Sequence, residues 1–247
     1  MKQELFEVTE NLYIAPGVLR MRLLGNVSEI TRPGQFVNIK AEGFYLRRPI
    51  SVCDIEPGQL TLIYKVVGRG TDWLRRQAPG TFLDLLVGLG NGYDTSFAGK
   101  SPLVIGGGVG VPPMYYLAKR LVAEGREVHA ILGFNKREEI FLTREFEELG
   151  VHTIVATADG SCGVQGFVTD AMRIMKNEYS YFYACGPELM LKAVCKASKT
   201  EGQLSFERRM GCGFGACMGC SCKTLTGYKR ICKEGPVMKK EEILWED

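Results

Sequence analysis

Three closely spaced cysteines near the C-terminus constrain this chain more than any other feature. Cys212, Cys217 and Cys220 form a C-x4-C-x2-C run within the segment GCGFGACMGC, and Cys232 follows after eleven further residues. This is the ligand spacing of a plant-type [2Fe-2S] cluster, in which four thiolates hold two irons. Because such a cluster carries one electron at a time, the chain must contain or contact a group that supplies and accepts electrons.

The residues around the run favour a cluster over other uses of thiols. Glycines interrupt the run and give its backbone the freedom to fold around a metal. A structural zinc site uses paired CxxC arms, and only Cys217 and Cys220 form one here. Cys222 is left out of the ligand set because the spacing is complete without it. The scattered Cys53, Cys162 and Cys195 are expected to be small buried side chains.

Length and composition indicate an ordinary globular protein. With 247 residues, of which 45% are hydrophobic and 24% charged, the chain can form two compact domains and a small appendage. The N-terminus MKQELFEVTE has no apolar signal region, and no uninterrupted apolar stretch reaches the length of about 18 residues needed to span a membrane. Nine cysteines gathered mostly at one end fit a reducing compartment. We therefore expect a cytoplasmic protein.

The formal charge of +3 does not indicate a nucleic-acid partner. Four thiolates on an oxidised cluster add about −2, and a dinucleotide pyrophosphate adds about −2 more. The basic residues are also dispersed along the chain rather than gathered in one stripe. Neither DNA nor RNA is predicted to bind.

The pattern of apolar residues changes near residue 99. Residues 4–92 hold short β-rich runs between turns, such as PGQFVNIKA and LTLIYKVVG, with one helix expected from Thr71 to Gln77. From residue 100 onward, strands alternate with helices, as in PLVIGGGVG followed by VPPMYYLAKRLVAEG. The sequence thus predicts an antiparallel β-barrel over 1–98, an α/β domain with a parallel sheet over 99–204, and a cluster-binding domain over 205–247.

Two loops of the α/β half suit a dinucleotide. Gly106, Gly107, Gly108 and Gly110 follow an apolar strand and precede a helix, where glycines let the backbone approach a pyrophosphate. The spacing is not G-x-G-x-x-G, so a simple tight turn is the alternative. The second loop, Cys185-Gly186-Pro187, ends a later strand at the carboxyl edge of the sheet, where ligands bind; a buried core thiol is the alternative for its cysteine.

The choice between NAD and NADP is left open by these residues. No acidic residue stands at Gly133-Phe134-Asn135, where the second strand of the sheet is expected to end, to hold a ribose 2′-hydroxyl. Lys136 and Arg137 follow directly and can accommodate a 2′-phosphate.

The barrel half contains two segments suited to phosphate. Arg47-Arg48-Pro49-Ile50-Ser51 presents guanidinium groups and a hydroxyl at the start of a strand. The loop Val67-Gly68-Arg69-Gly70-Thr71 offers backbone N–H groups and the start of a helix. Each alone is equally compatible with an ordinary surface turn, but together they favour a phosphate-bearing cofactor beside the α/β half.

The combination of motifs resembles a known family. R-P-x-S, G-x-G-T, G-G-G-x-G, C-G-P and the C-x4-C-x2-C…C tail followed by G-P-V are together similar to the electron-transfer subunits of class 1B dihydroorotate dehydrogenases, within the ferredoxin reductase superfamily. The resemblance extends over essentially the whole chain, including D-G-S at 159–161 and E-R-R-M just before the cluster motif. The first motifs belong to the wider superfamily, and the tail is the specific part.

The resemblance implies a set of cofactors, their residues and a partner. FAD would bind at Arg48, Pro49, Ile50, Ser51, Ile63, Tyr64, Lys65, Gly70 and Thr71. NAD would bind at Gly106, Gly107, Gly108, Gly110, Cys185, Gly186 and Pro187, and the cluster at Cys212, Cys217, Cys220 and Cys232. The partner would be an FMN-containing catalytic subunit that oxidises dihydroorotate in pyrimidine biosynthesis, in a heterotetramer with two copies of each chain.

The cofactor set is also consistent on chemical grounds. NAD accepts only hydride and the cluster only single electrons, so a flavin is needed to convert one into the other. No catalytic side chain is predicted, and His129 and His152 lie in strand-like segments where structural roles are expected. Two alternatives remain: a reductase subunit with the same cofactors that serves a ferredoxin, hydrogenase or sulfur-metabolising partner, and a non-enzymatic binding module stabilised by zinc.

Overall fold

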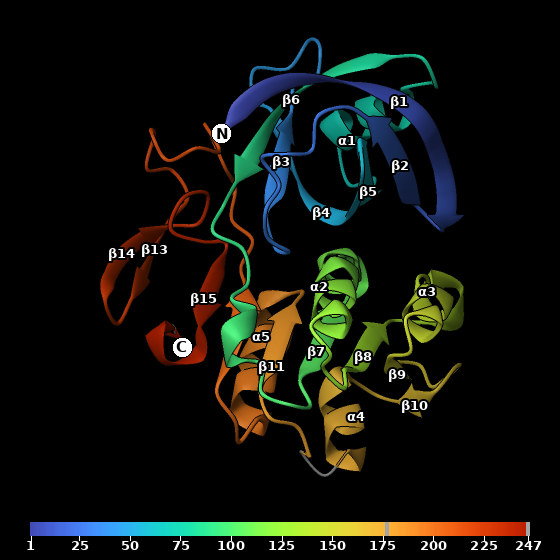
Figure 1. Cartoon of the computed structure of the whole chain (residues 1–247), viewed down its shortest axis with the longest axis vertical. Helices are drawn as coiled ribbons and strands as arrows, with labels where there is room; N and C mark the ends of the chain where they lie inside the picture. The colour runs from blue at the N-terminus through green and yellow to red at the C-terminus, as the bar shows by residue number, and fades with distance from the viewer. Residues whose placement is uncertain (176–177, 246–247) are drawn as a thin grey trace.

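The computed structural model describes residues 1–175 and 178–245. It consists of a β-barrel stacked on an α/β sheet, with the cysteine-rich segment packed beside both (Figure 1). The barrel and the parallel arrangement of the sheet agree with the fold class predicted from the sequence.

The barrel is formed by the first strands of the chain. In the described residues they are β1 (Lys2–Ala15), β2 (Val18–Leu24), β3 (Phe36–Ile39), β4 (Arg48–Glu56), β5 (Gln59–Lys65) and β6 (Phe82–Leu89), closed in the order β1-β2-β5-β4-β3-β6. Alternate residues of β6 are buried, as expected for strands with one face on a core. Helix α1 (Arg69–Arg75) begins and ends two residues before the predicted bounds, and its Leu74 packs into the barrel core.

The second half is a sheet of mostly parallel strands. Its order in the described residues is β10-β9-β8-β7-β11-β12-β15. The parallel strands are β7 (Leu103–Gly107), β8 (His129–Phe134), β9 (His152–Thr157), β10 (Val164–Gln165), β11 (Phe182–Cys185) and β12 (Gly202–Ser205). The central strands β7 and β11 are buried along their whole length, because helices cover both faces of the sheet.

Helices and short 3-10 turns connect these strands. The helices are α2 (Val111–Ala123), α3 (Thr143–Glu148), α4 (Val168–Ile174) and α5 (Glu188–Ala197), and the turns are η1 (Thr95–Phe97), η2 (Gly108–Gly110), η3 (Arg137–Glu139) and η4 (Lys240–Glu242). Helix α2 joins the two halves, since Tyr116 packs into the barrel core while Met114 and Leu117 pack into the core of the sheet. No described helix is long and apolar enough to cross a membrane.

The cysteine-rich segment forms a hairpin and then returns to the sheet. Strands β13 (Ser221–Thr224) and β14 (Gly227–Arg230) pair with each other, and β15 (Val237–Lys239) pairs antiparallel with β12. Asn91 fastens this return, because its side-chain amide donates to the carbonyls of Glu234 (3.0 Å) and Val237 (2.8 Å). The proposed domain boundary at 204/205 lies within β12, and the boundary at 98/99 lies in the connection between β6 and β7.

Candidate cofactor-binding site

A first cavity, of about 310 Å³, lies where the barrel meets the sheet; we call it the barrel cavity. Strands β4 and β5 and the start of α1 form one wall, and the ends of β11 and β12 form the other. Many residues predicted for FAD from distant parts of the sequence line it together: Pro49, Ile50, Ser51, Ile63, Tyr64, Lys65 and Thr71. Cys185, which was predicted for NAD, lines it as well.

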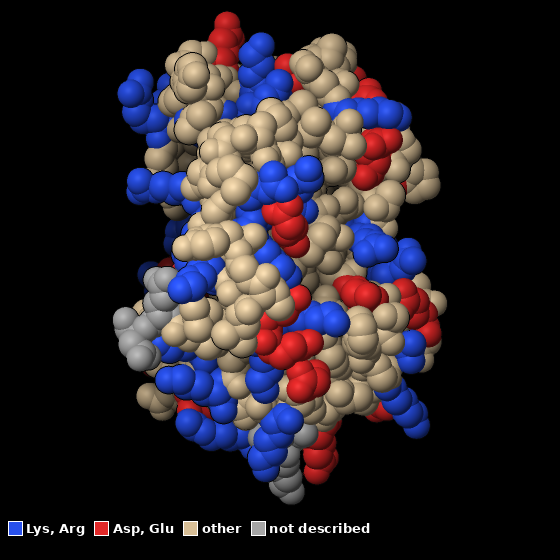
Figure 2. Space-filling view, turned by 90° about the vertical axis from the view of Figure 1, so that its left-hand side faces the viewer, with Lys and Arg blue, Asp and Glu red and all other residues tan. Residues whose placement is uncertain are grey.

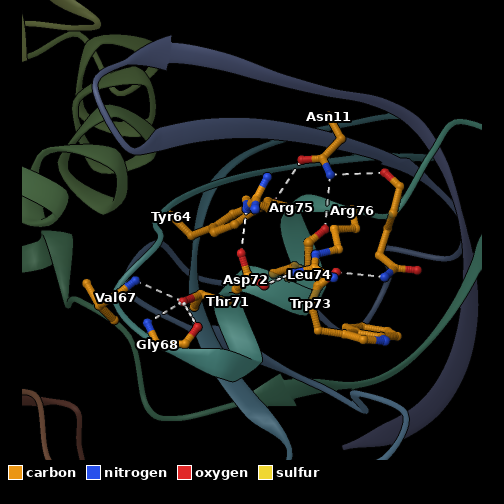
Figure 3. A network of polar contacts seen from close by, with 11 residues as sticks. Asn11, Tyr64, Val67, Gly68, Thr71, Asp72, Trp73, Leu74, Arg75 and Arg76 are labelled. Carbon is orange, nitrogen blue, oxygen red and sulfur yellow. Dashed lines mark hydrogen bonds and ion pairs between the residues drawn. The ribbon is translucent and has the colours of Figure 1, made fainter.

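Thr71 shapes the loop that precedes α1. Its hydroxyl oxygen accepts hydrogen bonds from the backbone N–H groups of Val67 (2.9 Å) and Gly68 (3.2 Å), and its hydroxyl donates to the Gly68 carbonyl at 3.1 Å (Figure 3). The hydroxyl is therefore committed to the loop backbone. Thr71 contributes to the cavity mainly by fixing the conformation of this loop.

Arg48 and Gly70 are packed against each other beside the barrel cavity and do not line it. A Cβ atom added at Gly70 would lie 1.7 Å from Nε of Arg48, so any other residue there would displace the guanidinium. The Arg48 guanidinium lies 4.7 Å from the centroid of the Phe44 ring, in a cation–π contact. These two predicted residues thus pack together at the start of α1, outside the barrel cavity.

Tyr64 lines the cavity, but its hydroxyl is fixed on the barrel side. It donates to Oδ1 of Asn11 at 2.9 Å, and Nδ2 of Asn11 donates to the carbonyls of Leu74 and Gln77, both at 3.0 Å (Figure 3). Burial raises the pKa of the Tyr64 hydroxyl. The network ties β1, β5 and α1 into one rigid wall.

A second cavity, of about 460 Å³, lies at the carboxyl edge of the sheet; we call it the sheet cavity. The predicted residues Gly107, Gly108 and Pro187 line it. Further lining comes from residues that follow β8 and β9, from the start of α4 and from α5: Gly133, Phe134, Asn135, Glu139, Ala158, Gly166, Phe167, Val168, Thr169, Leu189, Met190 and Ala193.

The remaining predicted glycines allow close packing next to the sheet cavity. A Cβ atom at Gly110 would lie 2.2 Å from the backbone oxygen of Cys185, and one at Gly106 would lie 2.7 Å from Cα of Val111. Gly186 has a φ of +157° and its position faces Met190. The glycine-rich loop and the Cys185-Gly186-Pro187 loop are therefore in direct contact.

The two cavities meet at these two loops. Val109 and Cys185 line the barrel cavity, whereas their neighbours Gly108 and Pro187 line the sheet cavity. Burial raises the pKa of the Cys185 thiol to about 12, so the thiol is uncharged at neutral pH. A group bound in one cavity can thus approach a group bound in the other across an uncharged boundary.

Two acidic residues of the cavities were missed in the sequence. Glu207 follows β12 and opens onto the barrel cavity, where desolvation by the surrounding protein raises the pKa of its carboxyl. Glu139 lies in η3 and reaches the sheet cavity, just beyond the Gly133-Phe134-Asn135 segment in which the sequence has no acidic residue. The E-R-R-M segment, which Glu207 begins, could have indicated Glu207 from the sequence. Nothing in the sequence indicated Glu139, because the turn η3 that places it was not predicted.

The four predicted cluster ligands approach one another as two pairs. The N–H of Cys212 donates to Sγ of Cys217 (3.4 Å), and the N–H of Cys217 donates to Sγ of Cys212 (3.4 Å). The N–H of Cys232 donates to Sγ of Cys220, also at 3.4 Å. Within the described residues, no three His, Cys, Asp or Glu gather as ligands of a single metal ion. Two pairs of thiols suit two irons better than one tetrahedral zinc.

The chemistry of the two pairs differs. Desolvation opposes ionisation of Cys212, but backbone N–H groups of Phe214 and Cys217 outweigh it and lower the pKa of its thiol to about 6. Burial raises the pKa of Cys232 to about 12. A metal deprotonates a coordinating thiol outright, so this second pair can also serve as thiolates. Cys222 lies outside both pairs, with its thiol directed to the Lys229 carbonyl at 3.6 Å.

The cysteine loop packs directly against the barrel. Nδ2 of Asn38, on β3, donates to the carbonyl of Cys212 at 3.2 Å. A Cβ atom at Gly213, whose φ is +79°, would lie 2.3 Å from the same Nδ2 atom. Met210, two residues before Cys212, lines the barrel cavity. The predicted cluster site is therefore adjacent to the barrel cavity.

Comparisons with known proteins agree with this arrangement. The iron-sulfur cluster binding domain of dihydroorotate dehydrogenase B matches residues 207–244, and an oxidoreductase NAD-binding domain matches residues 104–196. The structure resembles that of an NADH-dependent reduced ferredoxin-NADP oxidoreductase, with a TM-score of 0.88 and 30% identity over 97% of this chain and 90% of that one. A cytochrome P450 reductase from Amycolatopsis shares the fold, with a TM-score of 0.72 and 24% identity over 80% of this chain and 66% of that one.

The fold and these matches define an NAD-linked iron-sulfur oxidoreductase of the ferredoxin reductase type, whose fold binds FAD. Dihydroorotate dehydrogenase B (NAD(+)) electron transfer subunits from Geobacillus sp. and Fusobacterium nucleatum are 44% and 42% identical to the chain, over 99% and 98% of it and 99% of each relative. The chain belongs to this family of electron transfer subunits. The predicted resemblance, fold class and cofactor set are confirmed, and a catalytic partner subunit is implied.

Proposed function

We propose that this chain passes electrons from dihydroorotate oxidation, at an FMN-containing catalytic subunit, through a [2Fe-2S] cluster and FAD to NAD in pyrimidine biosynthesis. The observation that carries the proposal is the spatial order of three sites. The cysteine loop contacts the barrel cavity through Met210, and the barrel cavity meets the sheet cavity at Val109 and Cys185. This order matches a path from single electrons to hydride.

We assign FAD to the barrel cavity. When bound there, the flavin supplies the conversion between one-electron and hydride chemistry. Ile50 and Ile63 offer apolar contacts, Ser51 and Lys65 offer polar ones, and Thr71 holds the loop before α1 in place at the edge of the cavity. Arg48 and Gly70 support this loop from outside the cavity.

We assign NAD to the sheet cavity, with its nicotinamide directed toward Cys185. The loop of Gly107 and Gly108 would face the pyrophosphate, because both residues line the cavity and no heavy atom lies within 4 Å of a Cβ added at Gly108. The neutral Cys185 thiol places no charge between the two cofactors. The role of these residues is to bind, orient and exclude water, and we assign no proton transfer to them.

We assign the cluster to Cys212, Cys217, Cys220 and Cys232, and the catalytic subunit to the surface around them. This part of the chain exposes apolar side chains, namely Phe214, Met218, Leu225 and Tyr228. Figure 2, which faces the side of the molecule that carries the segment, shows broad uncharged areas between scattered basic and acidic residues. Such a surface suits a stable subunit contact. We further propose two copies of each chain in a cytoplasmic complex, and domains over 1–98, 99–204 and 205–247.

The test is to co-express the chain with its FMN-containing partner, purify the complex without oxygen and measure dihydroorotate-dependent reduction of NAD. We expect flavin and [2Fe-2S] absorption, a mass of two copies of each chain, and NADH formation. The same spectrum without dihydroorotate activity would instead favour a reductase subunit serving a ferredoxin or another partner. A colourless protein containing zinc would contradict both assignments.

A further inference from the structure

The sheet cavity contains one charged side chain, and its position bears on the choice between NAD and NADP. Among the described residues that line the cavity, Glu139 alone is acidic or basic. We infer that Glu139 selects NAD over NADP, by accepting a hydrogen bond from the ribose hydroxyls of the adenosine and repelling a 2′-phosphate. The inference rests on the proposed function, because it takes the sheet cavity as the site of the dinucleotide.

Glu139 is held in place by its own loop. It ends the turn η3, which follows β8 at the carboxyl edge of the sheet, and its side chain is half-buried. Its Oε2 atom accepts a hydrogen bond from Nδ2 of Asn135 at 2.8 Å, and Asn135 also lines the cavity. Within the described residues, no donor is bonded to the other carboxylate oxygen. An oriented carboxylate with a free oxygen is suited to accept a hydrogen bond from a hydroxyl.

The basic residues of this loop are directed elsewhere. Nε of Arg137 donates to the carbonyl of Ser161 at 3.0 Å, and its backbone N–H donates to the Ser161 hydroxyl at 2.8 Å. Nζ of Lys136 lies 3.8 Å from Oε2 of Glu138. Neither Lys136 nor Arg137 lines the cavity. The sequence left a 2′-phosphate site at these two residues possible, but the described residues that line the cavity include no cation to neutralise such a phosphate.

A 2′-phosphate carries a charge of about −2 at neutral pH, which a nearby carboxylate disfavours. The general pattern is known in nucleotide-binding sheets, where an acidic residue beyond the second strand holds the ribose hydroxyl. β8 is the second strand of the α/β half in chain order. Glu139 meets the same need from a 3-10 turn rather than from the end of the strand itself.

A second acidic residue lies close by and must be distinguished. The N–H of Asp159 donates to the Asn135 carbonyl at 3.1 Å, which joins the loops after β8 and β9. Oδ1 of Asp159 accepts from the N–H (3.0 Å) and the hydroxyl (2.6 Å) of Ser161. Asp159 is exposed and is not among the residues lining the cavity, whereas Glu139 is. The structure therefore favours Glu139 as the discriminating residue.

The test measures binding of NAD and NADP to the complete complex by calorimetry, without turnover. We expect wild type to bind NAD at least about tenfold more tightly than NADP, and Glu139→Gln to narrow this ratio by about tenfold. The matched control is Glu138→Gln, because Glu138 is the adjacent carboxylate, carries the same charge and is exposed outside the cavity. This control should keep the wild-type ratio.

Three results would contradict parts of this account. An unchanged ratio in Glu139→Gln, with NAD still bound, would overturn the inference alone. A ratio narrowed in Asp159→Asn but not in Glu139→Gln would also overturn it, and would move the role to Asp159. A wild-type complex that binds neither nucleotide, or that binds NAD unaffected by blocking variants at Gly107 and Gly108, would overturn the proposed function itself.

Discussion

The cysteine segment and the two cavities bring together the residues of a redox-group site in different ways. The four cysteines lie within one short stretch, from Cys212 to Cys232, and its local turns bring the thiols together in pairs. The barrel cavity is instead lined by residues from Phe36 to Pro236, and it exists only because the barrel, the sheet and the returning strand β15 pack together. A metal site can thus be built by local chain folding, whereas a flavin site here requires correct packing of two domains.

The largest effect is expected from removing one cluster ligand. We expect Cys217→Ser to abolish the [2Fe-2S] absorption and dihydroorotate-dependent NAD reduction, because serine does not replace the thiolate. FAD content and reduction of a dye by NADH should stay close to wild type, since the barrel cavity contains none of the four cysteines. Absorption spectra and the two assays on the purified complex measure this.

The matched control for this variant is Cys222→Ser. Cys222 lies in the same segment but outside both pairs of thiols, so its variant should retain the cluster. Loss of flavin in Cys217→Ser would contradict the contrast between a locally folded cluster site and a separate flavin cavity. It would show that the cysteine segment and the barrel cavity form one folding unit.

A smaller effect, on NADH oxidation, is expected from a change at the contact between the two cavities. In Gly110→Val, the new Cβ atom would lie 2.2 Å from the backbone oxygen of Cys185, so the two loops must separate. We expect kcat/KM for NADH oxidation to fall by about 10- to 100-fold, because a displacement of about 1 Å at a reacting site has effects of this size. Cluster absorption should remain unchanged.

Gly125→Asn is the control for this second prediction. Gly125 follows the other end of α2, has a φ of +76° and has no heavy atom within 4 Å of an added Cβ. Asparagine tolerates this backbone conformation better than other residues. Wild-type activity in Gly110→Val would show that the cavities do not depend on the packing of these two loops.

The same difference explains which parts of the site could be predicted from the sequence. The cysteine spacing, the glycine-rich loop and the Cys185-Gly186-Pro187 loop are continuous, so their residues could be named before the structure. The role of Arg48 and Gly70 as supports, and of Thr71 as a loop clamp, depends on side-chain packing that no spacing encodes. Strand β15 was missed for a similar reason, because its pairing with β12 joins segments separated by the whole cysteine-rich loop.

The smallest effect is expected at the amino edge of the sheet, opposite the cavities. There, His129 and His152 are paired in register on β8 and β9, with ring centroids 5.3 Å apart, and His129 Nε2 lies 3.0 Å from the Ser101 hydroxyl. Desolvation and the electrostatic interaction with His152 lower the pKa of His129, while the Glu127 carboxylate acts to raise it.

The sign of the resulting pH effect follows from this pKa. In the unfolded chain the pKa of His129 is about 6.5, and in the folded chain it is lower, so protonation favours unfolding. The contribution of neutral His129 to the free energy of unfolding is complete above about pH 6.5, and it is lost as the pH falls through the lower pKa of the folded chain. We expect His129→Gln, which keeps a polar partner for Ser101, to reduce the fall in thermal midpoint between pH 7 and pH 5.5 by about 1 to 2 °C. His152→Gln should act in the same direction, because it removes an interaction that lowers the pKa of His129. Binding of FAD and NAD should not change in either variant, because the pair lies away from both cavities. Equal losses of midpoint in wild type and His129→Gln would show that the pair does not titrate as the structure indicates.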